Sequence, residues 1–403
     1  MASKVQQLRA CTMAVALGLA ACGSNAVPAA SAPASTLAPA PSAKPALAFV
    51  SLVESAPVET TLDHASIPNA HVVWLDMIER AEKRLDLAEF YVSDGAPGNR
   101  LAPILDAIEK AAARGVAVRL LVENEFASKY PDTLARLEGK PGIQVRRFKV
   151  GPLMGGILHA KYFVVDDREA YLGSQNFDWR SLEHIQEIGV HVRHAGVAQA
   201  LADVFDTDWD LAGGALASAR HKRTHAQPEG VRLVASPKGF LPDEAAWELP
   251  QIISGIDAAK KSVHVQVLTY RAGSRDGSPF RDLDDALRRA AARGVEVHLL
   301  VANWSKRGES KASIDELAHV PGVTVRVITI PDPSSGPIPF ARVAHAKYMV
   351  TDGAHAWVGT SNWEGDYFTR SRNVGVWLDG GAIPGELEVV FNDGWSGVYA
   401  SPW

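Results

Sequence analysis

Six residues that can bind or transfer a phosphoryl group recur at identical spacing in two parts of the chain. Each set starts at a histidine, and a lysine (+2), an aspartate (+7), a glycine (+14), a hydroxyl residue (+15) and an asparagine (+17) follow it. The two sets are His159, Lys161, Asp166, Gly173, Ser174 and Asn176, and His345, Lys347, Asp352, Gly359, Thr360 and Asn362. One such match would be weak evidence, but two complete matches indicate a functional constellation.

These residue types suit the chemistry of a phosphodiester anion. Lysine ammonium groups and carboxamide N–H groups can bind its non-bridging oxygens without a metal ion. An imidazole, with a pKa of about 6.5, serves as a nucleophile when neutral and as an acid when protonated. We therefore expect a covalent phosphohistidine, with the second histidine protonating the leaving oxygen. We expect no metal or cofactor, because each motif has a lysine where a second metal ligand would be needed.

The sequence around these motifs is also repeated within the chain. Residues 111–122 recur as 290–301, residues 141–146 recur as 321–326, and the motif itself recurs 186 positions later. The shift grows from 180 to 186, which predicts an insertion between Pro331 and Ile338 in the second copy. A nearly constant shift over more than 100 residues indicates a duplicated unit.

Each copy alternates helical and strand patterns. In the first copy, helices are expected around 74–81, 101–113 and 131–137, and strands over 85–92, 116–122, 144–148 and 162–165, with Gly115 ending the second helix. This order predicts an α/β lobe of helices packed on a sheet. We place lobe 1 at 49–211, a linker at 212–230 and lobe 2 at 231–403.

If each His-x-Lys triplet is on a strand, its histidine and lysine face the same side. Packing of the two lobes about a pseudo-twofold axis would then bring both pairs into one shared active site. The linker carries a basic run, residues 220–223, for which a solvated connection is favoured over a phosphate site.

The N-terminal residues predict export rather than a folded element. Lys4 and Arg9 precede a short apolar run that is typical of a signal peptide, residues 1–21. Leu19-Ala20-Ala21-Cys22 resembles the lipobox of bacterial lipoproteins, which implies lipidation of Cys22, and residues 22–48 are an Ala-, Pro- and Ser-rich tether. The alternative is an ordinary signal peptide with an incidental cysteine. Lipidation predicts a membrane-anchored protein of the cell envelope or periplasm, at the outer membrane if the cell is Gram-negative.

Composition excludes several classes of protein. Net charge is −5, which disfavours a generic basic nucleic-acid coat protein, so any phosphate site must be local. The cysteines, Cys11 and Cys22, both lie near the N-terminus, so the remaining chain has neither a disulfide framework nor a thiolate site.

The doubled motif resembles the signature of the phospholipase D superfamily, H-x-K-x4-D-x6-G-S/T-x-N. The resemblance covers about residues 50–400, and residues 173–182, 341–351 and 359–363 are similar to the branch that holds lysosomal 5′-exonucleases and poxvirus envelope phospholipase-like proteins. It implies two α-β-α sandwich lobes and a phosphodiesterase. The sequence gives no sign of an obligate protein partner.

The family also implies a carboxylate that hydrogen-bonds the far nitrogen of a motif histidine. Glu187 lies 28 residues after His159, whereas Asn373 lies 28 residues after His345. This asymmetry predicts that Glu187 holds His159 as the nucleophile and that His345 is the acid, which agrees with the family's usual assignment.

Several roles stay open. Asp166 and Asp352 are catalytic candidates that could instead anchor turns. Asn176, Asn362, Ser174 and Thr360 are expected to bind substrate. Phe177, Trp179 and Trp363 could stack on a base, cover a lipid or belong to the core.

Three functions are compatible with the sequence. The first is cleavage of single-stranded nucleic acid from an end, which rests on the branch resemblance. The second is hydrolysis or transfer of phospholipid headgroups, beside which a lipid anchor would place the enzyme. The third is a catalytically silent lipoprotein scaffold, against which the two complete motifs count heavily.

Overall fold

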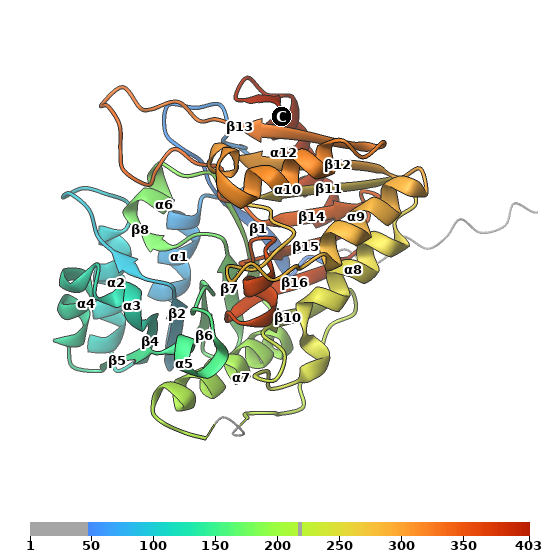
Figure 1. Cartoon of the computed structure of the whole chain (residues 1–403). Coiled ribbons are helices and arrows are strands. Elements are labelled where there is room, and N and C mark those ends of the chain that lie inside the picture. The colour runs from blue at the N-terminus through green and yellow to red at the C-terminus, as the bar shows by residue number, and fades with distance from the viewer. Residues whose placement is uncertain (1–46, 217–219) are drawn as a thin grey trace, which may run out of the picture. The chain divides into compact units, whose positions relative to one another are not determined.

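Two mixed β-sheets, one from each copy of the repeat, form the framework of the protein (Figure 1). The computed structural model describes residues 47–216 and 220–403, which belong to one compact unit. The expected signal peptide, Cys22 and nearly all of the expected tether precede residue 47 and lie outside the described residues. Within the described ranges, no helix is long and apolar enough to cross a membrane.

Lobe 1, from β1 to α7, contains a seven-stranded sheet of order β1-β9-β7-β6-β2-β4-β5. Its strands are β1 (Val50–Ser55), β2 (Arg84–Glu89), β4 (Ala117–Glu123), β5 (Ile143–Phe148), β6 (Tyr162–Val165), β7 (Glu169–Gly173) and β9 (Glu187–Val192), with β3 (Val92–Ser93) and β8 (Phe177–Asp178) paired separately. Its helices are α1 (Ala70–Glu79), α2 (Ala102–Ala113), α3 (Asn124–Ala127), α4 (Pro131–Glu138), α5 (Val150–Met154), α6 (Trp179–Glu183) and α7 (Ala195–Ala212).

Lobe 2, from β10 to β17, repeats this plan in an eight-stranded sheet of order β10-β16-β15-β14-β11-β12-β13-β17. Its strands are β10 (Val231–Ser236), β11 (Ser262–Val267), β12 (Glu296–Ala302), β13 (Val323–Ile328), β14 (Tyr348–Thr351), β15 (His355–Gly359), β16 (Asn373–Asp379) and β17 (Ala400–Pro402). Its helices are α8 (Glu248–Ala258), α9 (Asp282–Ala292), α10 (Gly308–Ala318), α11 (Gly365–Thr369) and α12 (Ile383–Ser396), with 3₁₀ turns η1 (Glu244–Ala246) and η2 (Asn303–Lys306).

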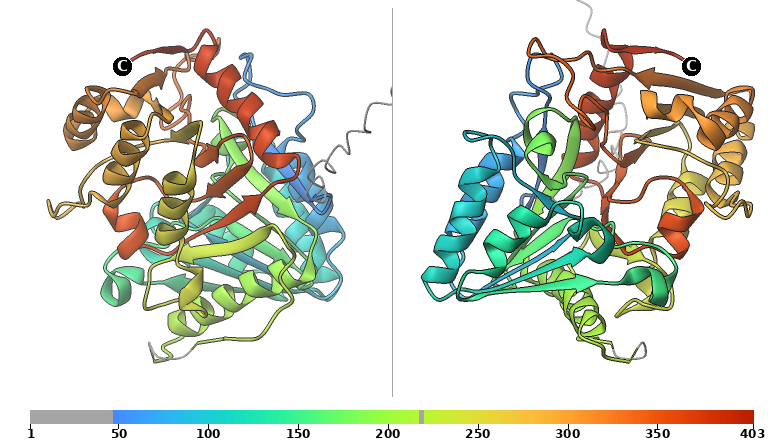
Figure 2. Two further views of the ribbon diagram at one scale, coloured as in Figure 1. Left: turned by 90° about the vertical axis from the view of Figure 1, so that its right-hand side faces the viewer. Right: turned by 60° about the vertical axis from the view of Figure 1, so that its left-hand side comes forward.

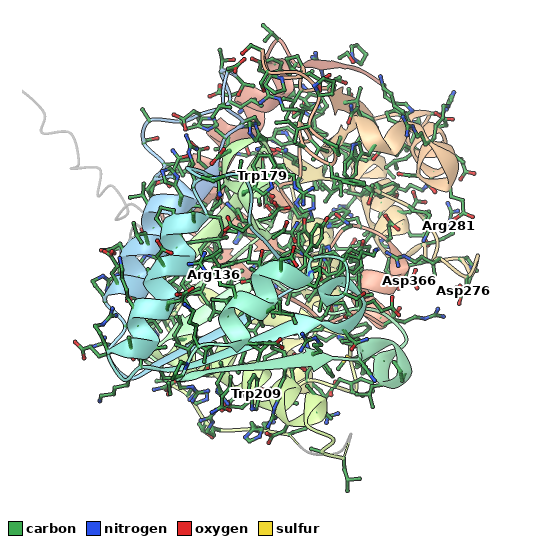
Figure 3. All side chains as sticks on the ribbon, turned by 90° about the vertical axis from the view of Figure 1, so that its left-hand side faces the viewer. Arg136, Trp179, Trp209, Asp276, Arg281 and Asp366 are labelled. Carbon is green, nitrogen blue, oxygen red and sulfur yellow. The ribbon has the colours of Figure 1, made fainter. Side chains whose placement is uncertain are left out.

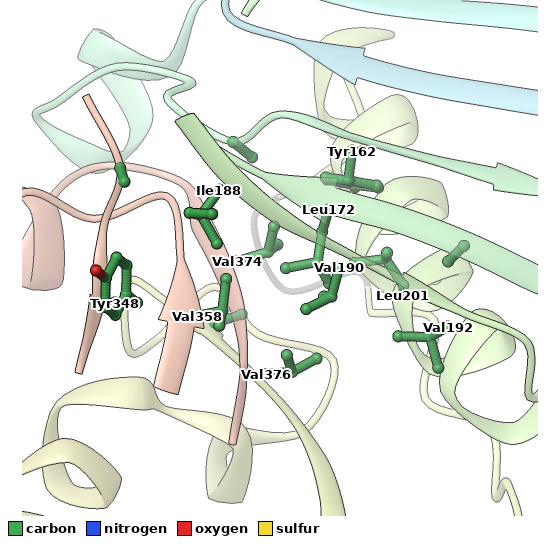
Figure 4. Close-up of a cluster of buried hydrophobic side chains, with 14 of the residues drawn as sticks. Tyr162, Leu172, Ile188, Val190, Val192, Leu201, Tyr348, Val358, Val374 and Val376 are labelled. Carbon is green, nitrogen blue, oxygen red and sulfur yellow. The ribbon is translucent and has the colours of Figure 1, made fainter. Parts of the chain in front are cut away.

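The helices cover the two sheets in layers (Figure 2). Apolar residues of α1, α2 and α4 pack on the outer face of the first sheet, and those of α8, α9 and α10 on the outer face of the second. The inner faces share one core, to which α7 and α12 also contribute. Figure 4 shows its centre, where Ile188 and Val190 of lobe 1 lie near Val358 and Val374 of lobe 2. The hydrophobic effect therefore joins the lobes as well as building each one.

The expected α/β fold of two duplicated lobes is confirmed, and each predicted helix and strand of the first copy has a counterpart. Gly115 follows α2 with φ of +95°, a left-handed conformation that glycine adopts without steric cost. The predicted strand 85–92 is interrupted at Phe90 and Tyr91, which separate β2 from β3. The His-x-Lys triplets precede β6 and β14 in irregular segments, so their expected place on regular strands is wrong.

The basic run between the lobes is largely engaged by acidic side chains. His221 Nε2 lies 2.7 Å from Asp210 Oδ2, and Arg223 pairs with Asp206 at 2.8 Å. Both aspartates belong to α7, so these contacts bind the connection to lobe 1 and favour a connecting role over a phosphate site.

Candidate active site

The segment leading into each motif histidine pairs with the opposite lobe. The backbone N–H of His159 donates to the carbonyl oxygen of Arg372 (2.9 Å), and that of His345 donates to the carbonyl oxygen of Gln186 (2.8 Å). An isolated parallel β-bridge lies beside each hydrogen bond. The two motif segments therefore meet at the boundary between the lobes and form one site.

This exchange of segments decides the partner of each histidine. Glu187 Oε2 lies 2.8 Å from Nδ1 of His345, and Asn373 Oδ1 lies 3.1 Å from Nδ1 of His159. The expected contact between Glu187 and His159 is therefore wrong. Glu187 follows Gln186 and Asn373 follows Arg372, so each partner is held beside the histidine of the other lobe.

Hydrogen bonds around Asn373 fix the tautomer of His159. Asn373 Nδ2 donates to the carbonyl oxygen of Tyr367 (2.8 Å), and Asn373 Oδ1 accepts from Thr360 Oγ1 (2.9 Å). The amide oxygen therefore faces the ring, so Nδ1 of His159 must carry the proton. The lone pair of Nε2 is then free to attack an electrophile.

The carboxylate of Glu187 is held just as firmly for His345. Glu187 Oε1 accepts from Ser181 Oγ (2.6 Å), and Oε2 is left to accept from Nδ1 of His345. Since Glu187 has no solvent exposure, the charge acts on the imidazole with little screening. A negative charge at this place stabilises the protonated form of His345.

Burial and neighbouring charges affect the pKa values of the two histidines differently. Burial lowers the pKa of His159 well below its usual value, and Lys161 and Lys347 lower it further. Burial also lowers the pKa of His345, but Glu187 opposes the shift. At neutral pH, His159 is therefore the neutral imidazole, and His345 more readily holds a proton.

The two motif lysines, Lys161 and Lys347, are completely buried. Each ammonium group donates to the backbone oxygen of its own motif histidine, Lys161 to His159 and Lys347 to His345. Burial lowers the pKa of Lys347 to about 7, with Glu187 opposing the shift. The pKa of Lys161 lies well below its usual value because of burial and the nearby Lys347. A phosphodiester anion would favour the charged form of both lysines.

Of the residues expected to bind substrate, the asparagines each have a buried oxygen without a partner. Oδ1 of Asn176 and of Asn362 accept no hydrogen bond within the described part of the chain, and only the Nδ2 groups could donate to a phosphodiester oxygen. The hydroxyl groups have internal partners instead: Ser174 Oγ bonds the backbone of Ile188, and Thr360 Oγ1 bonds Asn373. The contacts favour a positioning role for Ser174 and Thr360.

The motif aspartates bind backbone N–H groups. Asp166 accepts from Lys83 (2.7 Å) and Arg84 (2.8 Å), and Asp352 accepts from Lys261 (2.7 Å). Both aspartates have left-handed φ angles, +54° and +56°. These contacts favour turn anchoring over the catalytic role considered for them.

The aromatic residues considered as stacking platforms are mostly core residues. Phe177 and Trp363 are each 1% exposed, and Phe177 stacks on Trp74 at 5.1 Å. Trp179, labelled in Figure 3, is half-buried and lies edge-on to His184. Phe177 and Trp363 therefore cannot stack on a substrate.

Two buried carboxylates beside the site escaped the motif analysis. Glu89, 1% exposed, opposes the lowering of the pKa of Lys161, and its Oε2 has no hydrogen-bond partner in the described residues. Glu123 Oε2 accepts from the backbone N–H of Leu158, directly before His159 (2.5 Å). The corresponding positions of the second copy are apolar. A comparison of the two copies could therefore have identified Glu89 and Glu123 from the sequence.

One cluster in the described ranges has the spacing of metal ligands, and it consists of His264, Glu296 and His298 on β11 and β12. It contains none of the motif residues. At the shared site, lysines accompany both histidines, and an ammonium group provides positive charge where a metal ion could otherwise act.

Comparison with known proteins identifies the family. The chain matches the family described as "Cardiolipin synthase, PLD-like domain" over residues 74–209 and 252–395. It is 32% identical to "Phospholipase D Z" of Dictyostelium discoideum, covering 88% of this chain and 90% of that protein. It is 30% identical to "5'-3' exonuclease PLD3" of Homo sapiens, covering 90% of this chain and 82% of that protein.

The fold agrees with a solved structure of phosphatidylserine synthase from Haemophilus influenzae, with a TM-score of 0.60, 13% identity and coverage of 83% and 85% of the two chains. The family match in both lobes and the 32% identity to Phospholipase D Z show that the chain belongs to the phospholipase D superfamily. It is an enzyme of that superfamily's phosphodiesterase class, with one complete motif in each lobe.

Proposed function

We propose that the protein cleaves single-stranded nucleic acid from an end, through a phosphohistidine and without a metal ion. The observation that carries this proposal is the pair of recessed imidazoles, His159 4% and His345 8% exposed, each held through Nδ1. A recessed site suits a flexible chain end better than a stacked duplex. Relatives named as 5'-3' exonucleases, at 30–31% identity, support the choice of nucleic acid.

In the proposed first step, Nε2 of His159 attacks phosphorus. An N–P bond forms and the P–O bond to the leaving group breaks, while Nε2 of His345 gives its proton to the leaving oxygen. In the second step, His345 accepts a proton from water, whose oxygen attacks phosphorus. The N–P bond breaks and both histidines return to their starting states.

We assign His159 as the nucleophile and His345 as the general acid, as expected from the sequence, but on the basis of different contacts. A nucleophile must be neutral, which burial and the uncharged Asn373 favour for His159. A general acid must hold a proton, which Glu187 favours for His345. Lys161, Lys347, Asn176 and Asn362 would bind the non-bridging oxygens, so no step requires a metal ion.

Trapping the intermediate tests the division of labour. The His345→Ala variant, mixed with a p-nitrophenyl phosphodiester and quenched at alkaline pH, should carry an adduct on His159 by mass spectrometry. A good leaving group needs little protonation, and no base then activates water to remove the adduct. The His159→Ala variant should carry none, whereas an adduct on His345 in that variant would reverse the assignment.

Phospholipid headgroups are the second candidate substrate. The 32% identity to a protein named phospholipase D, and the family's description as cardiolipin synthase, favour it. The two functions separate when the full chain is given a 5′-hydroxyl oligonucleotide and phosphatidylcholine vesicles in parallel. Faster turnover of the vesicles, or phosphatidyl transfer to an added alcohol, would overturn the nucleic-acid proposal.

We also propose that the chain is exported and anchored to a membrane through Cys22. Lys4, Arg9, the apolar run and the lipobox-like residues before Cys22 support this location. Stable attachment takes more than one acyl chain, which bacterial lipoprotein processing provides.

A further inference from the structure

Four aromatic side chains of lobe 1 form a continuous row that starts beside His159. We call Phe90, Tyr91, Phe126 and Tyr130 the aromatic row. The Phe90 ring centroid lies 5.2 Å from that of His159 and 4.0 Å from that of Phe126. Tyr91 stacks on Tyr130, with centroids 4.9 Å apart. All four residues are half-buried, so part of their surface stays open to a ligand next to the recessed site.

Cationic side chains accompany these rings. Lys161 Nζ lies 5.0 Å from the centroid of Phe90, and Lys129 Nζ lies 3.9 Å from that of Phe126. The guanidinium group of Arg180 lies 5.6 Å from the centroid of Tyr130, but its charge is already paired with Asp178 at 2.8 Å. Lys129 is exposed and forms no ion pair within residues 47–216 and 220–403. Its charge is therefore available to an anion.

The second copy shows that the fold itself does not require these rings. The positions that correspond to the aromatic row are occupied by Leu268, Thr269, Ser305 and Glu309. The polar replacement is well accommodated, because Ser305 Oγ donates to the carbonyl oxygen of Leu268 at 3.0 Å. Glu309 forms an ion pair with Arg271 at 2.6 Å, so the position that corresponds to Tyr130 carries an acidic side chain in lobe 2. Tyr367 of lobe 2 also lies beside His159, with ring centroids 4.8 Å apart, but it is 7% exposed, whereas the rings of the aromatic row are half-buried.

We infer that the aromatic row binds the nucleobases of a single strand whose scissile phosphodiester lies between His159 and His345. This inference rests on the proposed function and adds the path of the strand, which runs over lobe 1. Rings alternating with cations suit nucleic acid, because bases stack on the rings and backbone phosphates meet the cations. An acyl chain would gain nothing from the exposed charge of Lys129.

The test compares normal oligonucleotides with oligonucleotides that lack one base at successive positions from the reacting end. Loss of a base that stacks on the row should lower kcat/KM of the full-length wild-type chain by about 5- to 150-fold. Phe126→Leu retains most of the side-chain volume but removes the ring, and it should abolish that penalty. Lys129→Gln changes an exposed residue that the fold does not need, and it should weaken the salt dependence of KM.

The control is Trp304→Leu, which removes a 42% exposed ring from η2 of lobe 2. This variant should retain the full penalty for a missing base. Turnover of bis(p-nitrophenyl) phosphate, which carries no nucleobase, reports on the phosphodiesterase chemistry alone and should be unchanged in Trp304→Leu.

The experiment distinguishes failure of the aromatic-row inference from failure of the nucleic-acid proposal. If the wild type cleaves oligonucleotides but tolerates missing bases as well as Phe126→Leu does, the row does not bind bases and the proposed function stands. Loss of the penalty in Trp304→Leu, with the penalty retained in Phe126→Leu, would likewise overturn the lobe 1 path. If the wild type cleaves the small ester and phosphatidylcholine vesicles but no oligonucleotide, both the inference and the nucleic-acid proposal are wrong.

Discussion

Replacing Glu187 by glutamine removes one buried charge and little else. The variant retains the shape of the side chain and an oxygen that can accept from Nδ1 of His345. It loses the negative charge that stabilises the imidazolium form of that ring. We expect the loss to fall on protonation of the leaving oxygen, because Glu187 contacts His345 rather than His159.

The size of the effect follows from the geometry. With Nδ1 and Oε2 2.8 Å apart, the centres of the two charges are about 4 Å apart, which is about 4 kcal/mol at an effective dielectric constant of 20. That corresponds to about three pKa units, and therefore to a loss of up to about 10³-fold in protonated His345 near neutral pH. The first-turnover rate on a diester with an alkoxide leaving group should fall by about 10²–10³-fold.

The assay measures the first turnover of two diesters that differ only in the leaving group. On the p-nitrophenyl ester the burst rate should fall less than about tenfold, because that leaving group departs without a proton. Ser181→Ala is the matched control. It removes the hydrogen bond to Glu187 Oε1 (2.6 Å) and keeps the charge, so it should slow either substrate only slightly.

An equal loss on both esters would refute this reasoning. It would mean that Glu187 assists the attacking imidazole, and His345 would then be the nucleophile. Thermal unfolding of each variant separates such a result from loss of the fold.

The remaining predictions concern metal, pH, stability and location. Activity should survive excess chelator, because Lys161 and Lys347 supply the positive charge; loss that a divalent ion restores would contradict this. Since the pKa of Lys347 is lowered to about 7, kcat/KM should fall as the pH rises through that value, as a pH profile would show. Asp166→Asn should reduce the free energy of unfolding by about 2 kcal/mol in denaturant titrations, with kcat nearly unchanged, because it weakens hydrogen bonds to backbone N–H groups. Cys22→Ser should release the protein from the membrane fraction, and fractionation like the wild type would count against the anchor.

The fold and the doubled motif were readable from the sequence because both are local patterns. Hydrophobic periodicity around Trp74 and Gly115 indicates helices and their ends, and the doubled spacing from His159 and His345 indicates two halves of one site. Duplication strengthened each inference, since one copy could be compared with the other. The same comparison, applied to Glu89 and Glu123, would have revealed two further buried charges.

The pairing of Glu187 with His345 could be decided only by the tertiary structure. Equal spacing along the chain suggested that each histidine uses the partner of its own lobe, because sequence separation was the available measure of proximity. The lobes instead exchange the segments before their histidines, and the backbone hydrogen bonds to Gln186 and Arg372 that hold these segments join residues more than 150 positions apart. Contacts of that kind arise from packing of two hydrophobic sheet faces, whose relative placement no local pattern encodes.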